Sequence, residues 1–372
     1  MKNIKLFLLL ILALSLIIGT QTLAYEKEII SNENNELSSF NISEFNQSPK
    51  LKAKVDKGEL PSVSERLPED PYVVTPIDKV GVYGGTLNTA TTRVTAFGED
   101  SMMMEPAHLV KAKTDGGGIV PDLARKIESS ADKTSWTIYL RKGVKWSDGE
   151  PFTADDIKFW YDHVLLNEDL TPVISISWKA NGEVFKLNKI DDYTVEFNFS
   201  APKPFLPNRL VHSAVFLPEH YAQQFHPDFV AEDKLNQMIS EEGYDNWWEL
   251  FRQKVGPWSA YLLGTIPTSN PEAPSLSAFK LVKQTSDRRA YERNPYFWKV
   301  DSQGNQLPYI DRIETIAVTD REVLNGKIMS GEIDFAGFEC DIRNYPMLKK
   351  YEDKGGYRTL LWNSMTNEVV YM

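Results

Sequence analysis

The period of the apolar residues changes within residues 134–164, and this change limits the folds open to the chain. Every second residue is apolar in the first part of the segment, as in a β-strand with one buried face. In the second part, the apolar residues recur at the spacing of a helix with one buried face. These positions are Trp136, Ile138 and Leu140 in the predicted strand, and Ile157, Trp160, Tyr161 and Val164 in the predicted helix. Thr153 and Asp156 form a capping-box pattern that predicts where the helix begins.

Similar patterns continue along the chain. Alternation predicts strands at residues 193–199, 279–282, 289–292 and 313–318. The second and third of these should form a hairpin, closed by the turn pair Asn294-Pro295. A second capping-box pattern at residues 319–322 predicts a helix that ends at Gly331. Its buried residues are expected to be Val323, Leu324 and Ile328. Because strands and helices are mixed throughout, we expect an α/β chain of the mixed α+β kind.

The first 24 residues have the three zones of a cleavable secretory signal. Two lysines supply positive charge, an apolar run covers residues 6–18, and small residues precede the expected cleavage after Ala24. A permanent anchor helix is the alternative, but this run is shorter than the roughly 20 apolar residues that cross a bilayer. We therefore expect residues 1–24 to be removed as a signal peptide and the mature chain to be soluble.

Charge and cysteine content exclude some classes of function. The chain has a formal net charge of −11 and no block of clustered Lys and Arg, so nucleic acid is not expected as a partner. Cys340 is the only cysteine and cannot form an internal disulfide. An exported chain without disulfides must gain its stability from a large core, for which a hydrophobic content of 42% is sufficient.

Residues 25–81 are expected to form a mobile or extended N-terminal lead-in. Residues 31–47 are rich in Asn, Glu and Ser and contain few apolar side chains, which is typical of a mobile terminus. A short helix can begin at Leu51 and stop at Gly58. Prolines between residues 61 and 76 then favour an extended chain.

Six segments, in the same order along the chain, resemble the family 5 extracellular solute-binding proteins, the peptide and oligosaccharide receptors of ABC importers. They cover residues 118–124, 139–149, 152–156, 217–221, 292–298 and 330–335. One such match would be weak, whereas six collinear matches are specific. Residues 58–61, 65–68 and 306–311 are similar to a branch of the family in which sugar ligands also occur.

The resemblance implies a two-lobed periplasmic binding protein fold with an extra subdomain on the first lobe. By this comparison, residues 82–110 begin lobe one, residues 111–200 form the extra subdomain, and residues 201–318 return to lobe one. Residues 319–372 begin lobe two. A domain of that size buries too little surface to stand alone, so we expect the second lobe to be truncated. A monomer is expected.

The same resemblance implies a non-catalytic receptor that closes two lobes over its ligand. Its expected ligand is a short oligopeptide, held largely through the peptide backbone, and its expected partner is an ABC permease in the inner membrane. The first alternative ligand is a β-linked oligosaccharide, on whose rings aromatic side chains would stack. The candidate ligand-binding aromatics are Phe97, Trp178, Trp247 and Trp362. Each can instead be a core-packing residue, since aromatic side chains are usually buried.

A secreted hydrolase is the second alternative, but the chain lacks the patterns of a catalytic site. Adjacent carboxylates at residues 155–156 and 241–242 would point about 100° apart on a helix and would not share one site. His220 and His226 are six residues apart, which matches no metal-ligand pattern. The sequence contains no nucleophile elbow, zinc-protease motif or phosphate loop. We therefore expect no catalytic residue, no metal site and no cofactor.

The residues just after the apolar run refine the expected location. Relatives in single-membrane bacteria usually carry a lipid-attachment cysteine there, whereas this chain has Ala24 and Tyr25. A receptor without a lipid anchor needs another barrier to retain it. We therefore expect a freely diffusing periplasmic protein, with release from the cell as the alternative.

Overall fold

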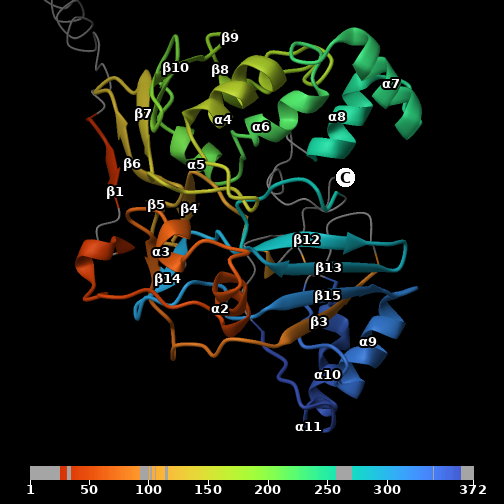
Figure 1. Ribbon diagram of the computed structural model, residues 1–372. Helices are drawn as coiled ribbons and strands as arrows, with labels where there is room; N and C mark the ends of the chain where they lie inside the picture. Colours follow the sequence, from red (N-terminus) through yellow and green to blue (C-terminus); the bar gives the residue numbers. More distant parts are fainter. Residues whose placement is uncertain are drawn as a thin grey trace, which may run out of the picture.

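Two β-sheets organise the chain, one above the other in Figure 1. The computed structural model describes residues 26–31, 35–92, 100, 103–104, 106–113, 116–256, 270–337 and 339–361. The first sheet is antiparallel and has the order β1 (Ile29–Ser31), β6 (Ala124–Ser129), β7 (Ser135–Leu140), β11 (Thr194–Asn198), β10 (Lys186–Asp191). The second has the order β12 (Phe279–Gln284), β13 (Arg288–Arg293), β15 (Arg312–Ala317), β3 (Thr86–Thr91), with β15 and β3 parallel. The predicted mixed α/β class is confirmed.

The first sheet buries the alternating residues that predicted its strands. Trp136 on β7 lies opposite Phe197 on β11, and Ile138 lies opposite Val195, with all four side chains buried. Cross-strand pairs of aromatic and β-branched side chains stabilise a sheet by roughly 0.2–1 kcal/mol each. The strands predicted around residues 136–140 and 193–199 are therefore confirmed.

Short helices lie beside the first sheet and form a helical layer (Figure 1). They are α4 (Ala154–Phe159), α5 (Leu206–Leu210), α6 (Glu219–Ala222), η6 (Gln223–Phe225), α7 (Glu232–Glu242) and α8 (Trp247–Val255). The predicted capping box is present at the start of α4. The amide of Thr153 donates to the carboxylate of Asp156, and the hydroxyl of Thr153 accepts from a backbone amide of the first helical turn. The other carboxylate oxygen of Asp156 accepts a hydrogen bond from the amide of Glu219 at 3.0 Å. One carboxylate therefore caps both α4 and α6.

The helix predicted after Thr153 departs from a regular α-helix at its C-terminal half. The chain widens there into a π-helical turn, η4 (Trp160–Leu165), in which the amide of Leu166 donates to the carbonyl of Tyr161, five residues back, at 3.2 Å. The predicted apolar stripe is buried in both halves. Apolar spacing alone does not distinguish the two forms over so short a segment, because both bury the same face.

The predicted hairpin is confirmed as β12 and β13, but its turn is not the predicted one. The amide of Thr285 donates to the carbonyl of Arg288 at 2.8 Å, and the hydroxyl of Thr285 donates to Asp287 at 2.7 Å. The turn therefore lies at residues 285–288. Asn294 follows β13 instead, and its side-chain amide donates to the carbonyl of Ser277 at 3.0 Å. The turn pair Asn294-Pro295 ends a strand and does not join two.

The helix predicted after residue 319 is confirmed as α9 (Arg321–Ser330), with its cap shifted by one residue. Asp320 is the N-cap, and its carboxylate accepts from the amide of Val323 at 2.8 Å. Leu324 is buried as expected, whereas Val323 is 41% exposed and lies outside the buried stripe. Gly331 ends the helix with a φ of +79°, a left-handed conformation that favours glycine.

The N-terminal segment packs onto the rest of the chain, in contrast to the predicted mobile lead-in. Strand β1 pairs with β6, and four apolar residues pack on a small buried cluster. The four are Leu37, Phe40, Ile42 and Phe45, and the cluster is Val63, Leu67, Val73 and Val300. The prediction of a mobile segment rested on the average composition, which is polar. It did not take account of these few apolar side chains, which pack against residues distant in sequence.

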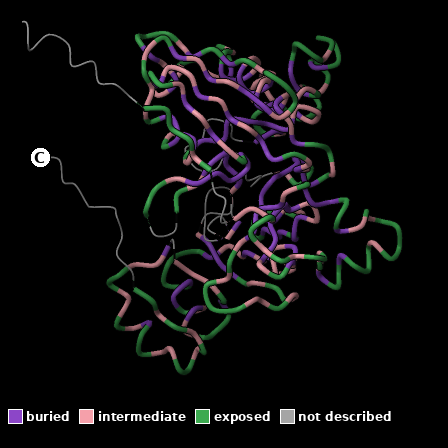
Figure 2. Tube along the Cα trace, turned by 90° about the vertical axis from the view of Figure 1, so that its left-hand side faces the viewer, coloured by how far each residue is buried: buried purple, intermediate pink, exposed green. Residues whose placement is uncertain are grey.

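The remaining elements are short. They are η2 (Leu37–Ser39), α2 (Pro49–Asp56), α3 (Val63–Arg66), β2 (Tyr72–Val74), β4 (Val110–Ala112), β5 (Ile119–Pro121), η5 (Ile176–Trp178), β8 (Lys179–Ala180), β9 (Glu183–Val184), β14 (Lys299–Asp301), η7 (Ile342–Asn344), α10 (Tyr345–Lys350) and α11 (Glu352–Gly355). Figure 2 shows that buried residues run through the interior of the trace, whereas exposed residues gather on its outer turns. Within the described ranges, no helix has the length and apolar character needed to cross a bilayer.

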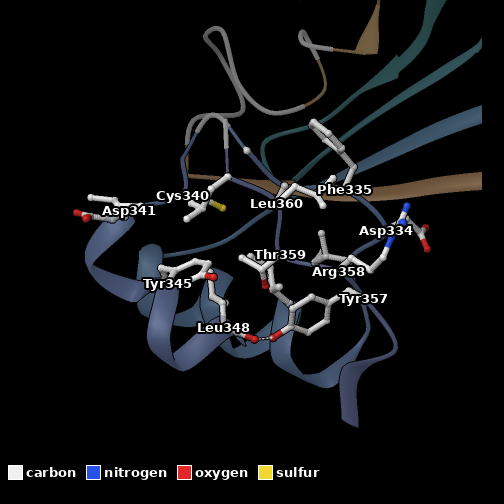
Figure 3. A pocket seen from close by; sticks show the side chains of 16 residues that line it. Asp334, Phe335, Cys340, Asp341, Tyr345, Leu348, Tyr357, Arg358, Thr359 and Leu360 are labelled. Atoms are coloured by element: carbon white, nitrogen blue, oxygen red, sulfur yellow. Dashed lines mark hydrogen bonds between the residues drawn. The ribbon is translucent and has the colours of Figure 1, made fainter. Parts of the chain in front are cut away.

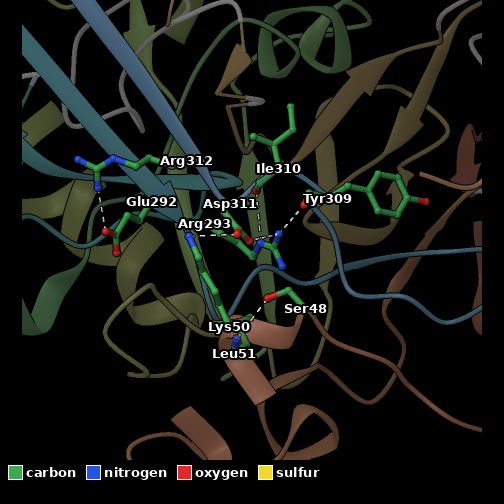
Figure 4. Close-up of polar contacts among 9 residues, drawn as sticks. All are labelled: Ser48, Lys50, Leu51, Glu292, Arg293, Tyr309, Ile310, Asp311 and Arg312. Atoms are coloured by element: carbon green, nitrogen blue, oxygen red, sulfur yellow. Dashed lines mark hydrogen bonds and ion pairs between the residues drawn. The ribbon is translucent and has the colours of Figure 1, made fainter. Parts of the chain in front are cut away.

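Ion pairs attach helix α2 to the second sheet. Arg293 of β13 lies 2.8 Å from the carboxylate of Asp311, and Lys50 of α2 lies 3.1 Å from the same carboxylate (Figure 4). Arg293 also donates to the backbone carbonyl of Tyr309. Arg293 and Asp311 are largely buried, whereas Lys50 is exposed, so the ion pair from α2 adds little stability to the buried pair.

Candidate functional site

A cavity of about 370 Å³ lies beside the second sheet, between α9, α10 and the chain after α11. Its walls are largely apolar and include Ile328, Ile333, Phe335, Leu348 and Leu360. Its polar groups come from Asp334, Asp341, Tyr345, Tyr357, Arg358 and Thr359. Figure 3 shows Cys340, Tyr345, Leu348, Tyr357 and Thr359 around it. An apolar pocket of this size with a few polar groups is typical of small-molecule binding sites.

The wall formed by residues 333–337 is held in place by the edge of β3. The amide of Asp334 donates to the carbonyl of Asn88 at 2.8 Å, and its carboxylate accepts from the backbone amide of Asn88 at 2.7 Å. One residue further along β3, the hydroxyl of Thr89 donates to the carbonyl of Phe335 at 3.0 Å. This wall is therefore hydrogen-bonded to β3 at Asn88 and Thr89.

A buried carboxylate lies at the carboxyl end of the same strand. Glu339 is 3% exposed and accepts hydrogen bonds from the hydroxyls of Thr91 and Thr92, at 2.5 and 2.6 Å, and from the amide of Thr92 at 3.0 Å. Charge-assisted hydrogen bonds of this kind are among the stronger ones in proteins. In open α/β sheets, ligands bind beyond the carboxyl ends of the strands. The end of β3 and the adjacent cavity are therefore the candidate functional site.

The side chains of this site suit binding better than catalysis. The hydroxyl of Tyr357 donates to the carbonyl of Leu348 at 2.6 Å, and Glu339 is occupied by the two threonines. Cys340, the one thiol at the cavity, has no histidine among the described lining residues. A nucleophile needs a base within hydrogen-bond reach. Among the described lining residues, no histidine is placed to act as such a base for this thiol.

The structure places two of the four candidate aromatics away from this cavity. Trp178 is 5% exposed, packs on Trp160 with ring centroids 5.5 Å apart, and lies under the guanidinium of Arg209. Trp247 lines a surface groove between α7 and α8, and its indole N–H donates to Asp169 at 3.1 Å. Phe97 and Trp362 lie outside the described residues. As ligand contacts, the four aromatics stay predictions.

His220 and His226, which lie six residues apart in the sequence, have different partners in the structure. Nε2 of His220 lies 2.8 Å from the carboxylate of Asp148. His226 contacts His163 and Asp228, and its burial lowers its pKa. His163 precedes His226 by 63 residues, so no local motif could have paired them.

Solved structures with similar folds define the class of protein. An oligopeptide-binding protein OppA matches with a TM-score of 0.77 and 36% sequence identity, over 86% of this chain and 50% of that chain. The periplasmic binding protein MelB of Agrobacterium fabrum C58, in complex with stachyose, matches with a TM-score of 0.67 and 25% identity, over 88% of this chain and 48% of that chain. The fold is therefore that of a periplasmic binding protein, seen here over about half of those structures.

The sequence profile of the bacterial extracellular solute-binding proteins, family 5, matches residues 118–372, which is more than half of the chain. The chain belongs to this family, and the resemblance of the six segments is confirmed. The family consists of non-enzymatic, solute-binding components of transporters.

Two curated relatives differ in the ligand for which they are named. A periplasmic alpha-galactoside-binding protein of Rhizobium meliloti is 29% identical over 309 residues, which is 77% of this chain and 40% of the relative. The periplasmic oligopeptide-binding protein OppA of Salmonella typhimurium is 24% identical over 245 residues, which is 62% of this chain and 37% of the relative. The chain thus spans less than half the length of these curated relatives.

Proposed function

We propose that this chain is the substrate-binding component of an ABC importer, or the part of one that it spans, and that it captures short peptides. The observation that carries the proposal is the match to an OppA structure at 36% identity over 86% of the chain. The expected signal at residues 1–24 and the periplasmic relatives support a periplasmic location. The partner is an ABC permease in the inner membrane, and the receptor acts as a monomer.

The pairing of the second sheet supports the proposed division of the chain. Strand β3 precedes residues 111–200 and pairs in parallel with β15, which follows them by more than 100 residues. We propose that β3 and the second sheet belong to lobe one, and that residues 111–200 form the subdomain inserted into it. Lobe two begins after this sheet, near the cavity. Ligand binding would then close the two lobes at the end of β3.

The carboxyl end of β3 is the proposed place of ligand contact. Thr91, Thr92 and Glu339 converge there, and Phe97, a predicted cleft residue, follows β3 by six positions. A peptide held through its backbone needs hydrogen-bonding groups at such an edge. The buried Glu339 would keep the start of the loop after β3 in one geometry.

An oligosaccharide is the second candidate ligand, because two of the similar proteins are named for sugars. One is named for alpha-galactosides and the other was solved with stachyose. The names therefore favour an α-linked galactoside, where the sequence alone suggested a β-linked oligosaccharide. Stacking of aromatic rings on pyranose rings would supply the contact.

A thermal-shift and tryptophan-fluorescence titration tests the proposal on the full-length gene product. The panel contains di- to pentapeptides of mixed sequence, stachyose as an α-galactoside, and a β-linked glucan oligomer. A ligand at about 100 times its Kd should stabilise the protein by about 2.7 kcal/mol. Stabilisation by peptides alone is the expected result, and stabilisation by stachyose alone would transfer the proposal to sugars.

Two controls separate this proposal from its alternatives. Glu339→Gln should weaken binding of the active ligand, whereas Glu292→Gln, which removes a half-exposed partner of Arg312, should not. Mass analysis of the ligand after incubation with pure protein tests the hydrolase alternative. Ligand turnover, or no stabilisation by any member of the panel, would overturn the receptor proposal.

A further inference from the structure

Two histidines and one carboxylate meet at the surface of the helical layer. His163 lies in η4, His226 directly follows η6, and Asp228 is two residues further on. One nitrogen or oxygen atom from each of the three lies within 4.8 Å of the others. Nδ1 of His163 is 2.8 Å from Oδ2 of Asp228, and Nδ1 of His226 is 3.6 Å from the same oxygen.

These separations fit the ligand set of a transition-metal ion. Zinc lies about 2.0–2.2 Å from nitrogen and oxygen ligands, so tetrahedral neighbours are about 3.3 Å apart. Two of the three separations, 2.8 and 3.6 Å, lie on either side of that value, and the third is at most 4.8 Å, so side-chain rotations would bring the three atoms to a common distance. Imidazole and carboxylate together suit Zn²⁺, Ni²⁺ and Cu²⁺. The carboxylate also supplies one negative charge against the charge of the cation.

The buried His226 has the hydrogen-bonding arrangement of a metal-binding histidine. Nε2 of His226 lies 3.1 Å from the backbone carbonyl of His163, and a carbonyl can only accept. Nε2 therefore carries the hydrogen and Nδ1 presents a lone pair toward Asp228. Metal-binding histidines almost always donate their second nitrogen in this way. The amide of Asp228 lies 3.2 Å from Nδ1, and a metal bond would replace this long contact.

The backbone that carries His163 is itself unusual. The π-helical turn η4 places the carbonyl and the imidazole of His163 on the side that faces His226 and Asp228. Fewer than about 1% of residues are in π-helices, and such turns occur frequently at functional sites. His163 thus supplies both its imidazole, as a metal ligand, and its backbone carbonyl, which orients the imidazole of His226.

The cluster is closed on one side and open on the other. His226 is fully buried, and the rings of Phe159, Phe229 and Trp247 pack around the two histidines with centroid separations of 4.8 to 6.2 Å. Asp228 is 58% exposed and His163 is 27% exposed, so an ion can enter from solvent. Rigid aromatic walls reduce the entropy lost when the ligands are fixed.

We propose that His163, His226 and Asp228 bind one divalent transition-metal ion, with Zn²⁺ as the probe. The bound ion would join η4 to the chain after η6 and stabilise the helical layer. The site does not depend on the proposed peptide ligand, and it differs from the sequence prediction of no metal. Nε2 of His220 also lies 2.8 Å from a carboxylate, but among the described residues His220 belongs to no such three-residue cluster, so it provides a matched control.

The test uses untagged, EDTA-treated protein in a Cys340→Ser background, which removes the only thiol. Isothermal titration with ZnCl₂ should give one site per chain, and Zn²⁺ should raise the melting temperature. His163→Gln and Asp228→Asn should each weaken Zn²⁺ binding by about tenfold or more, whereas His220→Gln should leave it unchanged. Co²⁺ should quench the fluorescence of Trp247, whose ring lies 4.9 Å from that of His226.

Three outcomes would contradict the proposed metal site. Absence of Zn²⁺ binding, unchanged affinity in both ligand variants, or an equal loss in His220→Gln would overturn the proposal. If His163→Gln does not fold by circular dichroism, the exposed Asp228→Asn variant decides alone. Because no peptide or sugar is present, failure here leaves the proposed receptor function untouched.

Discussion

Arg289 and Asp100 form an ion pair in which neither side chain is exposed to solvent. Nε of Arg289 lies 2.8 Å from one carboxylate oxygen, and Nη2 lies 2.8 Å from the other. The pair connects β13 to Asp100, which lies in the sequence between β3 and β4. Removal of two charges from water is costly, and paired geometry is what offsets that cost.

Asp100→Ala should destabilise the protein by about 3–5 kcal/mol, because it leaves the Arg289 guanidinium buried without its carboxylate. The double variant Asp100→Leu/Arg289→Met should be much closer to the wild type, since no charge remains uncompensated. Urea unfolding followed by far-UV circular dichroism measures both. A single variant as stable as the wild type would contradict the role of the pair.

Asp320→Ala should cost about 1 kcal/mol, because it removes the N-cap of α9. Thr319→Ala is the matched control, since the hydroxyl of Thr319 only donates to Asp320 at 3.2 Å. Amide hydrogen exchange in α9 and the urea midpoint report the difference. A larger loss in Thr319→Ala than in Asp320→Ala would instead place the cap at Thr319, as the sequence pattern suggested.

Gly331→Ala and Gly243→Ala should differ in cost although both glycines end helices at similar left-handed φ values, +79° and +76°. Each substitution should cost about 1–2 kcal/mol for the backbone alone. A Cβ at Gly331 would also lie 2.5 Å from the carbonyl oxygen of Gly355, whereas a Cβ at Gly243 would meet no atom within 4 Å. Thermal unfolding should therefore show the larger loss for Gly331→Ala, and the reverse order would refute this packing argument.

The pair His220 and Asp148 should give a pH-dependent contribution to stability. Burial opposes charge on both groups, but their mutual hydrogen bond and attraction raise the pKa of His220 and lower the pKa of Asp148. The contribution of His220 is present below its unfolded pKa of about 6.5 and is lost as pH rises through the folded pKa. That of Asp148 is present above about 3.9 and is lost as pH falls through its folded pKa.

The measurement is the difference in urea midpoint between wild type and His220→Gln across this range. The difference should be largest between about pH 4 and pH 6.5 and should shrink above it. His212→Gln, which replaces a histidine elsewhere in the chain, is the control. A difference that does not vary with pH would show that the pair is only a packing contact.

The contribution of Asp156 to stability should change with pH in the direction opposite to that of Asp148. Burial raises its pKa to about 7, against the amides of Thr153 and Glu219, which favour the charged form. The folded state therefore keeps a proton that the unfolded state loses near pH 4, so stability should fall as pH rises from about 4 to about 7. Asp156→Asn should flatten this fall, and Asp155→Asn, which removes a half-exposed partner of Lys189, should not.

Local patterns predicted the elements well where one residue and its near neighbours decide the outcome. The alternation at Trp136, Ile138 and Leu140 was sufficient for β7, and the capping box at Thr153 marked the start of α4. The cap of α9 was wrong by one position, because Thr319 and Asp320 are both good N-caps and spacing alone does not choose between them. The hairpin turn was wrong because a proline marked the end of β13 more strongly than residues 285–288 marked the turn.

The candidate site depends on contacts that no local pattern contains. Thr91 and Glu339 are 248 residues apart, and Asn88 and Asp334 are 246 apart. The cavity exists only after β3 has been brought beside the segment that follows α9. The aromatics chosen from the sequence were chosen by residue type, which does not show which face of the fold a ring occupies. Trp178 illustrates this, since its ring packs on Trp160 in the core and not against a ligand cavity.

The parallel pairing of β3 with β15 has a consequence for the order of folding. β3 cannot find its partner until Ala317 is available, and closure of so long a loop carries a large entropic cost. Strands β6, β7, β10 and β11 pair within residues 124–198, and such local pairings form faster. Residues 124–198 should therefore acquire their structure first. The sheet that carries the candidate site is then completed last, and its unpaired strand edges leave the chain exposed to misfolding until β3 and β15 have paired.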